Sequence, residues 1–164
     1  MYLSPRKIML VVTLVASVAL SALAWSFEAA QSDPAPVIQL LPGDLKWSSD
    51  PNLHGLQTVA LAGNPNAPEP YAERIRLPAD CRLAPHSHPN EARMVTVLSG
   101  TLYFAYGDRF DEAKLKALPA GSFFTEPKDM PHYAMTKEEV LLQLNAIGPA
   151  GTKYVEAQEE FKEK

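Results

Sequence analysis

Two histidines, His86 and His88, stand one residue apart in the sequence, and this spacing is suited to metal binding. On an extended strand, residues i and i+2 project from the same face, with side-chain origins about 6–7 Å apart. Two imidazoles placed in this way can converge on one cation, each at about 2.0–2.1 Å if the metal is zinc. The pair is weak evidence by itself, because single histidines also occur as ordinary surface or core residues.

A third histidine and the residues between the three extend the pattern. An apolar run that ends at Gly100 follows the first pair, and His132 follows a segment that begins at Gly121. These spacings resemble the two motifs of the cupin family, G-x5-H-x-H-x3-4-E-x6-G and G-x5-P-x-G-x2-H-x3-N. The chain matches six of the ten motif positions, namely His86, His88, Gly100, Gly121, Pro127 and His132.

The resemblance covers about residues 71–147 and implies an all-β fold, a single-domain cupin with a jelly-roll (double-stranded β-helix) barrel. It also implies one divalent transition metal, with iron, zinc, manganese and nickel as candidates, held by His86, His88 and His132. More narrowly, the segments H-S-H-P, V-T-V-L-S-G-T and L-P-A-G-S-F resemble a bacterial, ChrR-like cupin subgroup of largely unassigned activity.

The sequence departs from the motifs at four positions. Asp80 and Asp129 replace two glycines, and because aspartate tolerates left-handed backbone better than most residues, we expect both turns to survive. Thr136 replaces an asparagine, which is a small loss of polar structure. The fourth change is more serious, since Arg93 replaces the glutamate that would ligate the metal. A cation cannot ligate a metal, and a dication beside it would repel it strongly.

Several arrangements accommodate Arg93. Glu91 could replace the missing ligand, since it shares the parity of Arg93 if the strand extends that far back. Alternatively, the site has three histidines and open positions, which resembles the oxygen-using cupins that lack the carboxylate. Arg93 could then point across the cavity and bind a substrate carboxylate through two parallel hydrogen bonds. We favour this combination over a barrel without metal, although a salt bridge from Arg93 to Glu91 or Glu73 explains the residue almost as well.

The remaining candidates for chemistry are weaker. Gln143, on a late apolar strand, could face the cavity and bind a metal-bound water, or its amide could simply be satisfied by backbone. Glu91 and Glu126 are the side chains that could serve as a strong general base. Cys81 lies five residues before His86, but buried structural cysteine is the commoner case. The case for an enzyme therefore depends on the metal.

Short apolar runs separated by Pro, Gly and Asp predict the elements that position these residues. Strands of four to eight residues with frequent turn signals favour an all-β sandwich or barrel, and 15 prolines leave little room for long helices. Residues 110–118 differ, because helix formers with apolar residues at 110, 115 and 118 predict a short helical insert. The expected strands are 37–41, 56–62, 71–77, 94–98, 101–106, 122–125, 132–135 and 140–147.

Composition excludes several classes of protein. The 164 residues are 46% hydrophobic and 21% charged, which predicts one globular domain and excludes a disordered chain. A formal net charge of −4 and a pI near 5.5 exclude a nucleic-acid binder that depends on broad positive charge. The single cysteine, Cys81, excludes a disulfide scaffold.

Residues 1–24 read as a signal peptide, in which Arg6 and Lys7 precede an uncharged apolar run. Ala22 and Ala24 form an A-x-A site, so we expect cleavage after Ala24, with a cut after Ser26 or an uncleaved anchor as alternatives. Residues 25–36 read as a linker, 37–156 as the cupin domain and 157–164 as a charged tail. Cleavage removes two cations, and the mature protein then has no basic cluster to hold it on a membrane.

These features predict an exported, metal-binding cupin that is periplasmic or secreted. The first hypothesis is a small-molecule dioxygenase or related metalloenzyme, because three neutral imidazoles leave the metal its full charge for an anionic substrate. The alternative is a non-catalytic periplasmic cupin that binds or senses a small ligand or metal. We expect a homodimer through the region 37–62, no nucleic-acid partner and no stable membrane insertion after cleavage.

Overall fold

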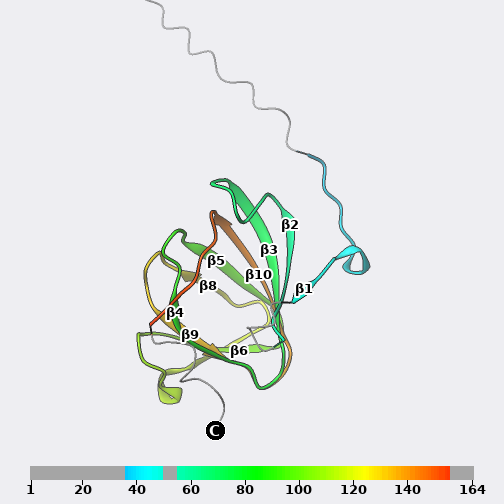
Figure 1. The fold of residues 1–164 in the computed structure, drawn as a ribbon. Coiled ribbons are helices and arrows are strands. Elements are labelled where there is room, and N and C mark those ends of the chain that lie inside the picture. Colours follow the sequence, from blue (N-terminus) through cyan, green and yellow to red (C-terminus); the bar gives the residue numbers. More distant parts are fainter. Residues whose placement is uncertain (1–35, 50–54, 156–164) are drawn as a thin grey trace, which may run out of the picture. The chain divides into compact units, whose positions relative to one another are not determined.

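The short apolar segments form antiparallel strands that belong to two sheets. The structure, a computed structural model, describes residues 36–49 and 55–155. Consecutive strands repeatedly alternate between the sheets, as β3 to β6 and β8 to β11 do, which is the arrangement of a jelly roll (Figure 1). In the described residues the elements are η1 (Pro42–Asp44), β1 (Ser48–Ser49), β2 (Gln57–Ala62), β3 (Pro70–Leu77), β4 (Arg82–Ser87), β5 (Arg93–Ser99), β6 (Thr101–Tyr106), η2 (Glu112–Lys114), β7 (Lys116–Pro119), β8 (Phe123–Glu126), β9 (His132–Met135), β10 (Val140–Ile147) and β11 (Lys153–Tyr154).

The core lies between the two sheets. The first sheet has the strand order β1-β2-β3-β10-β5-β8 and the second β11-β4-β9-β6-β7. Strand β10 shows the alternation that builds the core, because Val140, Leu142 and Leu144 are buried while the residues between them are not. From the second sheet, Leu102 and Phe104 of β6 belong to the same buried cluster. The all-β jelly-roll prediction is therefore confirmed.

Two aspartates occupy the turns in which the cupin motif has glycine. The backbone of Asp80 has φ 56° and that of Asp129 has φ 61°, both in the left-handed region. The expectation that aspartate would preserve these turns is confirmed. Thr136 also retains a polar role, because its buried Oγ1 accepts a hydrogen bond from the Cys81 amide at 3.0 Å and donates one to the Pro78 carbonyl at 2.7 Å.

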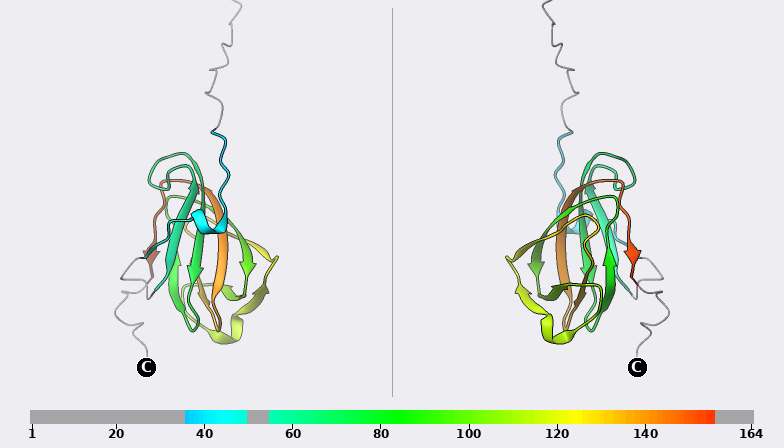
Figure 2. Two further views of the ribbon diagram at one scale, coloured as in Figure 1. Left: turned by 90° about the vertical axis from the view of Figure 1, so that its right-hand side faces the viewer. Right: turned by 90° about the vertical axis from the view of Figure 1, so that its left-hand side faces the viewer.

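The helix expected at residues 110–118 is replaced by a short turn and a strand. Only Glu112–Lys114 is helical, as the 3-10 turn η2 at one end of the sheets (Figure 2). The following residues form β7, which pairs with β6 and sets Leu118 opposite Leu102. Helix propensity is a weak preference, and here the backbone hydrogen bonds and partial burial available at the sheet edge outweigh it.

The predicted signal peptide 1–24, its cleavage after Ala24, most of the linker 25–36 and the tail 157–164 lie outside the described residues. From residue 37 onward the described chain belongs to one compact unit. In the part that the structure describes, none of the helices has the length and apolar character needed to cross a bilayer.

Candidate metal centre

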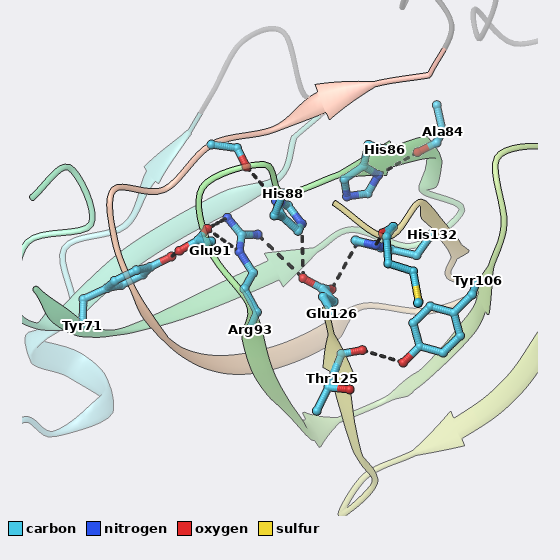
Figure 3. A network of polar contacts seen from close by, with 12 residues as sticks. Tyr71, Ala84, His86, His88, Glu91, Arg93, Tyr106, Thr125, Glu126 and His132 are labelled. Carbon is cyan, nitrogen blue, oxygen red and sulfur yellow. Dashed lines mark hydrogen bonds and ion pairs between the residues drawn. The ribbon is translucent and has the colours of Figure 1, made fainter. Parts of the chain in front are cut away.

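The pairing of β4 with β9 brings the three predicted histidines together. His86 near the end of β4 lies directly opposite His132, the first residue of β9. His88 follows just after β4, so its ring projects toward the same place as that of His86 (Figure 3). The ring centroids of His86 and His132 are 4.4 Å apart. The ring centroid of His88 lies 5.2 Å from that of His86 and 5.1 Å from that of His132.

The three rings are close enough to share one cation. One ligand atom from each of His86, His88 and His132 lies within 4.8 Å of the other two, and all three residues are buried. The prediction that distant segments of the chain bring three imidazoles to one point is therefore confirmed.

A backbone carbonyl fixes the orientation and the tautomer of each ring. The carbonyl of Ala84 accepts a hydrogen bond from Nδ1 of His86 at 2.7 Å, and that of Gly151 accepts one from His88 at 2.7 Å. The carbonyl of Met130 does the same for His132 at 3.0 Å. Because a carbonyl can only accept, Nδ1 carries the proton of each neutral ring, and Nε2 keeps a lone pair for a metal.

The free nitrogens are the strongest sign that a cation belongs here. Within the described residues, the buried Nε2 atoms of His88 and His132 have no hydrogen-bond partner. Buried polar atoms without a partner are rare and call for an explanation. Neutral imidazoles are the preferred ligands of zinc, iron, copper and nickel, so the donor set fits the implied divalent transition metal.

Burial keeps the rings in the form that binds metal. Burial, and then the charge of His132, lower the pKa of His86 to about 4. Burial also lowers the pKa of His132, against the opposing effect of Glu126. Both rings are therefore neutral at pH 7 and need not lose a proton before they coordinate a metal.

Glu126, at the end of β8, is the carboxylate that the structure places beside these rings. Its Oε2 lies 3.2 Å from Nε2 of His88, and its Oε1 lies 3.6 Å from Nε2 of His132. Burial would raise the pKa of Glu126, but the contact with His88 and the charges of His132 and Arg93 outweigh it and lower that pKa to about 2. The sequence suggested this residue only as a general base.

Glu91, the predicted alternative ligand, lies on the far side of Arg93 from the histidines (Figure 3). Its carboxylate accepts hydrogen bonds from Tyr71 Oη at 2.7 Å and from Arg93 Nε at 2.7 Å. The strand β5 begins at Arg93, so the parity that would have aimed Glu91 at the metal does not extend back to it. This placement corrects the expectation that Glu91 could ligate the metal.

Gln143 does not face the cavity either. Its side chain accepts a hydrogen bond from Nε of Arg74 at 3.3 Å. The inward positions of β10 are taken by Leu142 and Leu144, so alternation along the strand turns Gln143 to the other face of the sheet. This placement corrects the expectation that Gln143 could reach a metal-bound water.

A cavity of about 180 Å³ lies beside the three histidines. Arg93 and Glu126 line it together with Glu73, a carboxyl group whose pKa is raised by burial. The rest of the wall is mostly apolar and includes Ile75, Leu102, Phe104, Leu142 and Tyr154. The sequence indicates Glu73 only as an ion-pair partner of Arg93, because nothing in its spacing places it in the cavity.

Solved structures share this architecture at low sequence identity. RemF, a polyketide cyclase from Streptomyces resistomycificus, matches with a TM-score of 0.60 at 16% identity over 74% of this chain and 87% of its own. An RmlC-like cupin from Shewanella frigidimarina matches with a TM-score of 0.53 at 18% identity, over 66% of this chain and 89% of its own. KdgF from Halomonas sp. gives 0.52 at 18% identity, over 66% and 93%.

Comparison with protein-family models finds no match to the sequence, and comparison with curated proteins finds none either. The fold evidence is therefore structural, and it agrees with the two histidine motifs. The chain therefore has the jelly-roll fold of these solved structures, one of which is an RmlC-like cupin.

Proposed function

We propose that the protein is an exported cupin metalloenzyme, in which His86, His88 and His132 hold one divalent transition metal beside a small-molecule cavity. The observation that carries this proposal is the state of the rings. Each Nδ1 donates to a backbone carbonyl, and the Nε2 atoms of His88 and His132 are buried without a hydrogen bond. Three rings oriented in this way have lone pairs available for one cation.

The size and lining of the cavity support a small, anionic substrate. At about 180 Å³ the cavity is smaller than the roughly 300–1,000 Å³ of pockets for drug-sized ligands. Arg93 supplies a positive charge in its wall, and the pair with Glu91 holds this guanidinium in place. We therefore propose Arg93 as the residue that positions an anionic group of the substrate, while the apolar wall excludes water.

When bound, iron(II) would supply oxygen chemistry and favour a dioxygenase, whereas zinc or manganese would supply Lewis-acid chemistry. That RemF is a polyketide cyclase supports an enzyme among the possible uses of this fold, although fold alone does not determine a reaction. The chain's own contribution is to orient the rings, to keep His86 and His132 neutral through burial and to shield the site from solvent.

Reconstitution tests the enzyme proposal. The purified mature protein is loaded separately with iron(II), zinc or manganese, and oxygen uptake is followed with 1,3-diketone, catechol and thiol substrates. We expect the wild-type protein to turn over a substrate and His88→Ala to lose that turnover. His88 lies outside both β4 and β9, so this substitution changes no residue of the two paired strands. Tight zinc binding without turnover of any substrate would instead support the non-catalytic binder.

Export is a separate part of the proposal, and it depends on residues 1–24. We propose that the mature chain begins at Trp25 and is periplasmic or secreted. Cell fractionation followed by mass determination of the intact protein checks this. A cytoplasmic protein that retains residues 1–24 would contradict it.

A further inference from the structure

The carboxylate missing from residue 93 has a counterpart on the adjacent strand. The cupin motif expects glutamate where this chain has Arg93. In the pairing of β5 with β8, the residue directly opposite Arg93 is Glu126. Residues paired across antiparallel strands point to the same face, so Glu126 projects from the same part of the sheet wall as Arg93 does.

The Glu126 carboxylate faces the metal-binding side of the rings. Carboxylates that only orient a metal-bound histidine accept a hydrogen bond from the ring nitrogen that does not bind the metal. In all three rings that nitrogen, Nδ1, is already hydrogen-bonded to a backbone carbonyl. Glu126 lies instead beside the Nε2 atoms of His88 and His132, so an orienting role does not explain its position.

The contacts of Glu126 with the rings are not hydrogen bonds. The 3.2 Å separation between Oε2 and Nε2 of His88 is within hydrogen-bond range, but Nε2 has no aligned partner in the described residues. In the tautomer that the Gly151 carbonyl favours, with the proton on Nδ1, the lone pairs of Nε2 and of the carboxylate oxygen face each other. A cation between them converts this repulsion into coordination.

The separations also match those of ligands on one metal. Two atoms each bound at about 2.1 Å lie about 3.0 Å apart at 90° and about 3.4 Å apart at 109°. Oε2 of Glu126 lies 3.2 Å from Nε2 of His88, and Oε1 lies 3.6 Å from Nε2 of His132, so each oxygen is near the spacing of a neighbouring ligand from one ring. The Glu126 carboxylate therefore reaches the position of an adjacent ligand with little movement.

Arg93 lies farther from Glu126 than from Glu91. The side chain of Glu126 is 12% exposed, and Nη1 of Arg93 lies 3.9 Å from Oε2. Arg93 is meanwhile held more closely by Glu91, through Nε at 2.7 Å and Nη2 at 2.5 Å. Glu91 thus offsets part of the positive charge of Arg93, which reduces the repulsion between Arg93 and a metal.

We propose that Glu126 is the fourth protein ligand of the metal, taking across the β5–β8 pair the role that the family motif assigns to residue 93. This inference rests on the proposed function, because it requires that the three histidines hold a metal. It replaces the three-histidine site that the sequence favoured with a site of three imidazoles and one carboxylate.

Cobalt(II) binding to Glu126→Gln tests the proposal, since its visible absorption reports directly on the ligands and its affinity can be measured by competition with a chelator. We expect the variant to bind cobalt(II) at least about 100-fold more weakly, because the loss of a ligand should exceed the 10–100-fold effect of residues that only orient ligands. We also expect the absorption bands to shift. Glu73→Gln, which changes another carboxyl group of the cavity wall, should leave both properties unchanged.

The outcomes separate this inference from the proposed function. If the wild-type protein binds no cobalt(II), both proposals fail. If it binds cobalt(II) and Glu126→Gln binds equally tightly with the same spectrum, the fourth ligand is refuted and the three-histidine site stands. If Glu126→Gln does not fold, Glu126→Asp decides. An altered spectrum with weaker binding supports ligation by the carboxylate, and wild-type behaviour overturns it.

Discussion

In each histidine of the site, one ring nitrogen orients the ring and the other is available to bind a metal. Nδ1 is bound to a backbone carbonyl, and Nε2 is directed toward the shared point. Burial reinforces this division, because it disfavours the charged ring. Burial of His86 and His132 therefore destabilises the metal-free protein under mildly acidic conditions, because both rings resist protonation there.

The stability of the metal-free protein should therefore fall on acidification from pH 7 to about pH 4. Burial lowers the pKa of His86 to about 4, so the unfolded chain takes up a proton near pH 6.5 that the native ring does not. Stability rises with pH wherever the unfolded state binds more protons. The shift corresponds to about 3 kcal/mol, measurable by urea unfolding of chelator-treated protein across this range.

Glu126 does not account for a loss in that window. Its pKa is lowered to about 2, so its contribution disappears only below about pH 4.5, where the unfolded carboxyl becomes protonated. A free energy of unfolding that stays constant between pH 7 and pH 4.5 would show that the native rings titrate like free histidines.

Glu91→Ala should destabilise the protein by about 3–5 kcal/mol, because it leaves the guanidinium of Arg93 buried without its partner. The side chain of Arg93 is 11% exposed and that of Glu91 is 0% exposed, and Tyr71 also loses its acceptor. Urea unfolding of the two proteins measures the effect.

Glu139→Ala is the matched control for this prediction. It removes the same kind of side chain from an ion pair with Arg76, in which Oε1 of Glu139 lies 3.8 Å from Nε of Arg76. The side chain of Glu139 is 66% exposed and that of Arg76 is 35% exposed. An exposed pair contributes at most about 1 kcal/mol. Equal effects of the two substitutions would be incompatible with a structural role for the buried pair.

The histidines could be predicted from sequence, but the carboxylate could not. Spacing of i and i+2 places His86 and His88 on one side of an extended segment wherever that segment lies in the fold. The position of Glu126 depends instead on the register of β5 against β8. Glu91 was misjudged for a related reason, since its parity depended on a strand that begins only at Arg93.

At the scale of the elements, the turn between β5 and β6 requires glycine for two reasons. Gly100 has φ +73°, and a Cβ atom there would lie 2.4 Å from the carbonyl oxygen of Glu139. We expect Gly100→Ala to destabilise the protein through both backbone strain and this contact, each by about 1 kcal/mol or more. Thermal and urea unfolding measure the loss.

Gly121→Ala separates the two effects. Gly121 has φ +87°, but a Cβ atom there meets nothing within 4 Å, so only the backbone strain applies. Gly100→Ala should therefore be more destabilising than Gly121→Ala by about 1 kcal/mol or more. The opposite order would mean that the backbone at Gly100 relaxes without cost.

The type of the elements was more predictable than the faces that they present. Alternating apolar runs predicted an all-β protein, because that period follows from the pleat of a strand. Gln143 was assigned to the wrong face although it shares its face of β10 with Asn145, whereas the buried face is entirely apolar, so alternation along this strand already indicates which side is the interior. By contrast, residues 116–119 form a strand only because β6 offers an edge to pair with.

At the scale of the whole molecule, we propose a homodimer through the region 37–62. At the start of this region, Val37 is 96% exposed and Leu41 is 72% exposed. A second copy of the chain could cover these apolar side chains. Light scattering after size exclusion should give twice the mass of the mature chain. Leu41→Asp should yield monomers, whereas Phe123→Asp, at an exposed aromatic of β8, should not. A monomeric wild-type protein would refute the proposal.

The metal content of the purified mature protein is the most direct test of the account, because the proposed function requires one cation bound by the three histidines. Elemental analysis of the wild-type protein should find about one transition-metal ion per chain. His132→Ala, which removes the ring that β9 contributes, should lose that metal while remaining folded. A wild-type protein that neither contains nor takes up a metal, or an unchanged metal content in His132→Ala, would contradict the account.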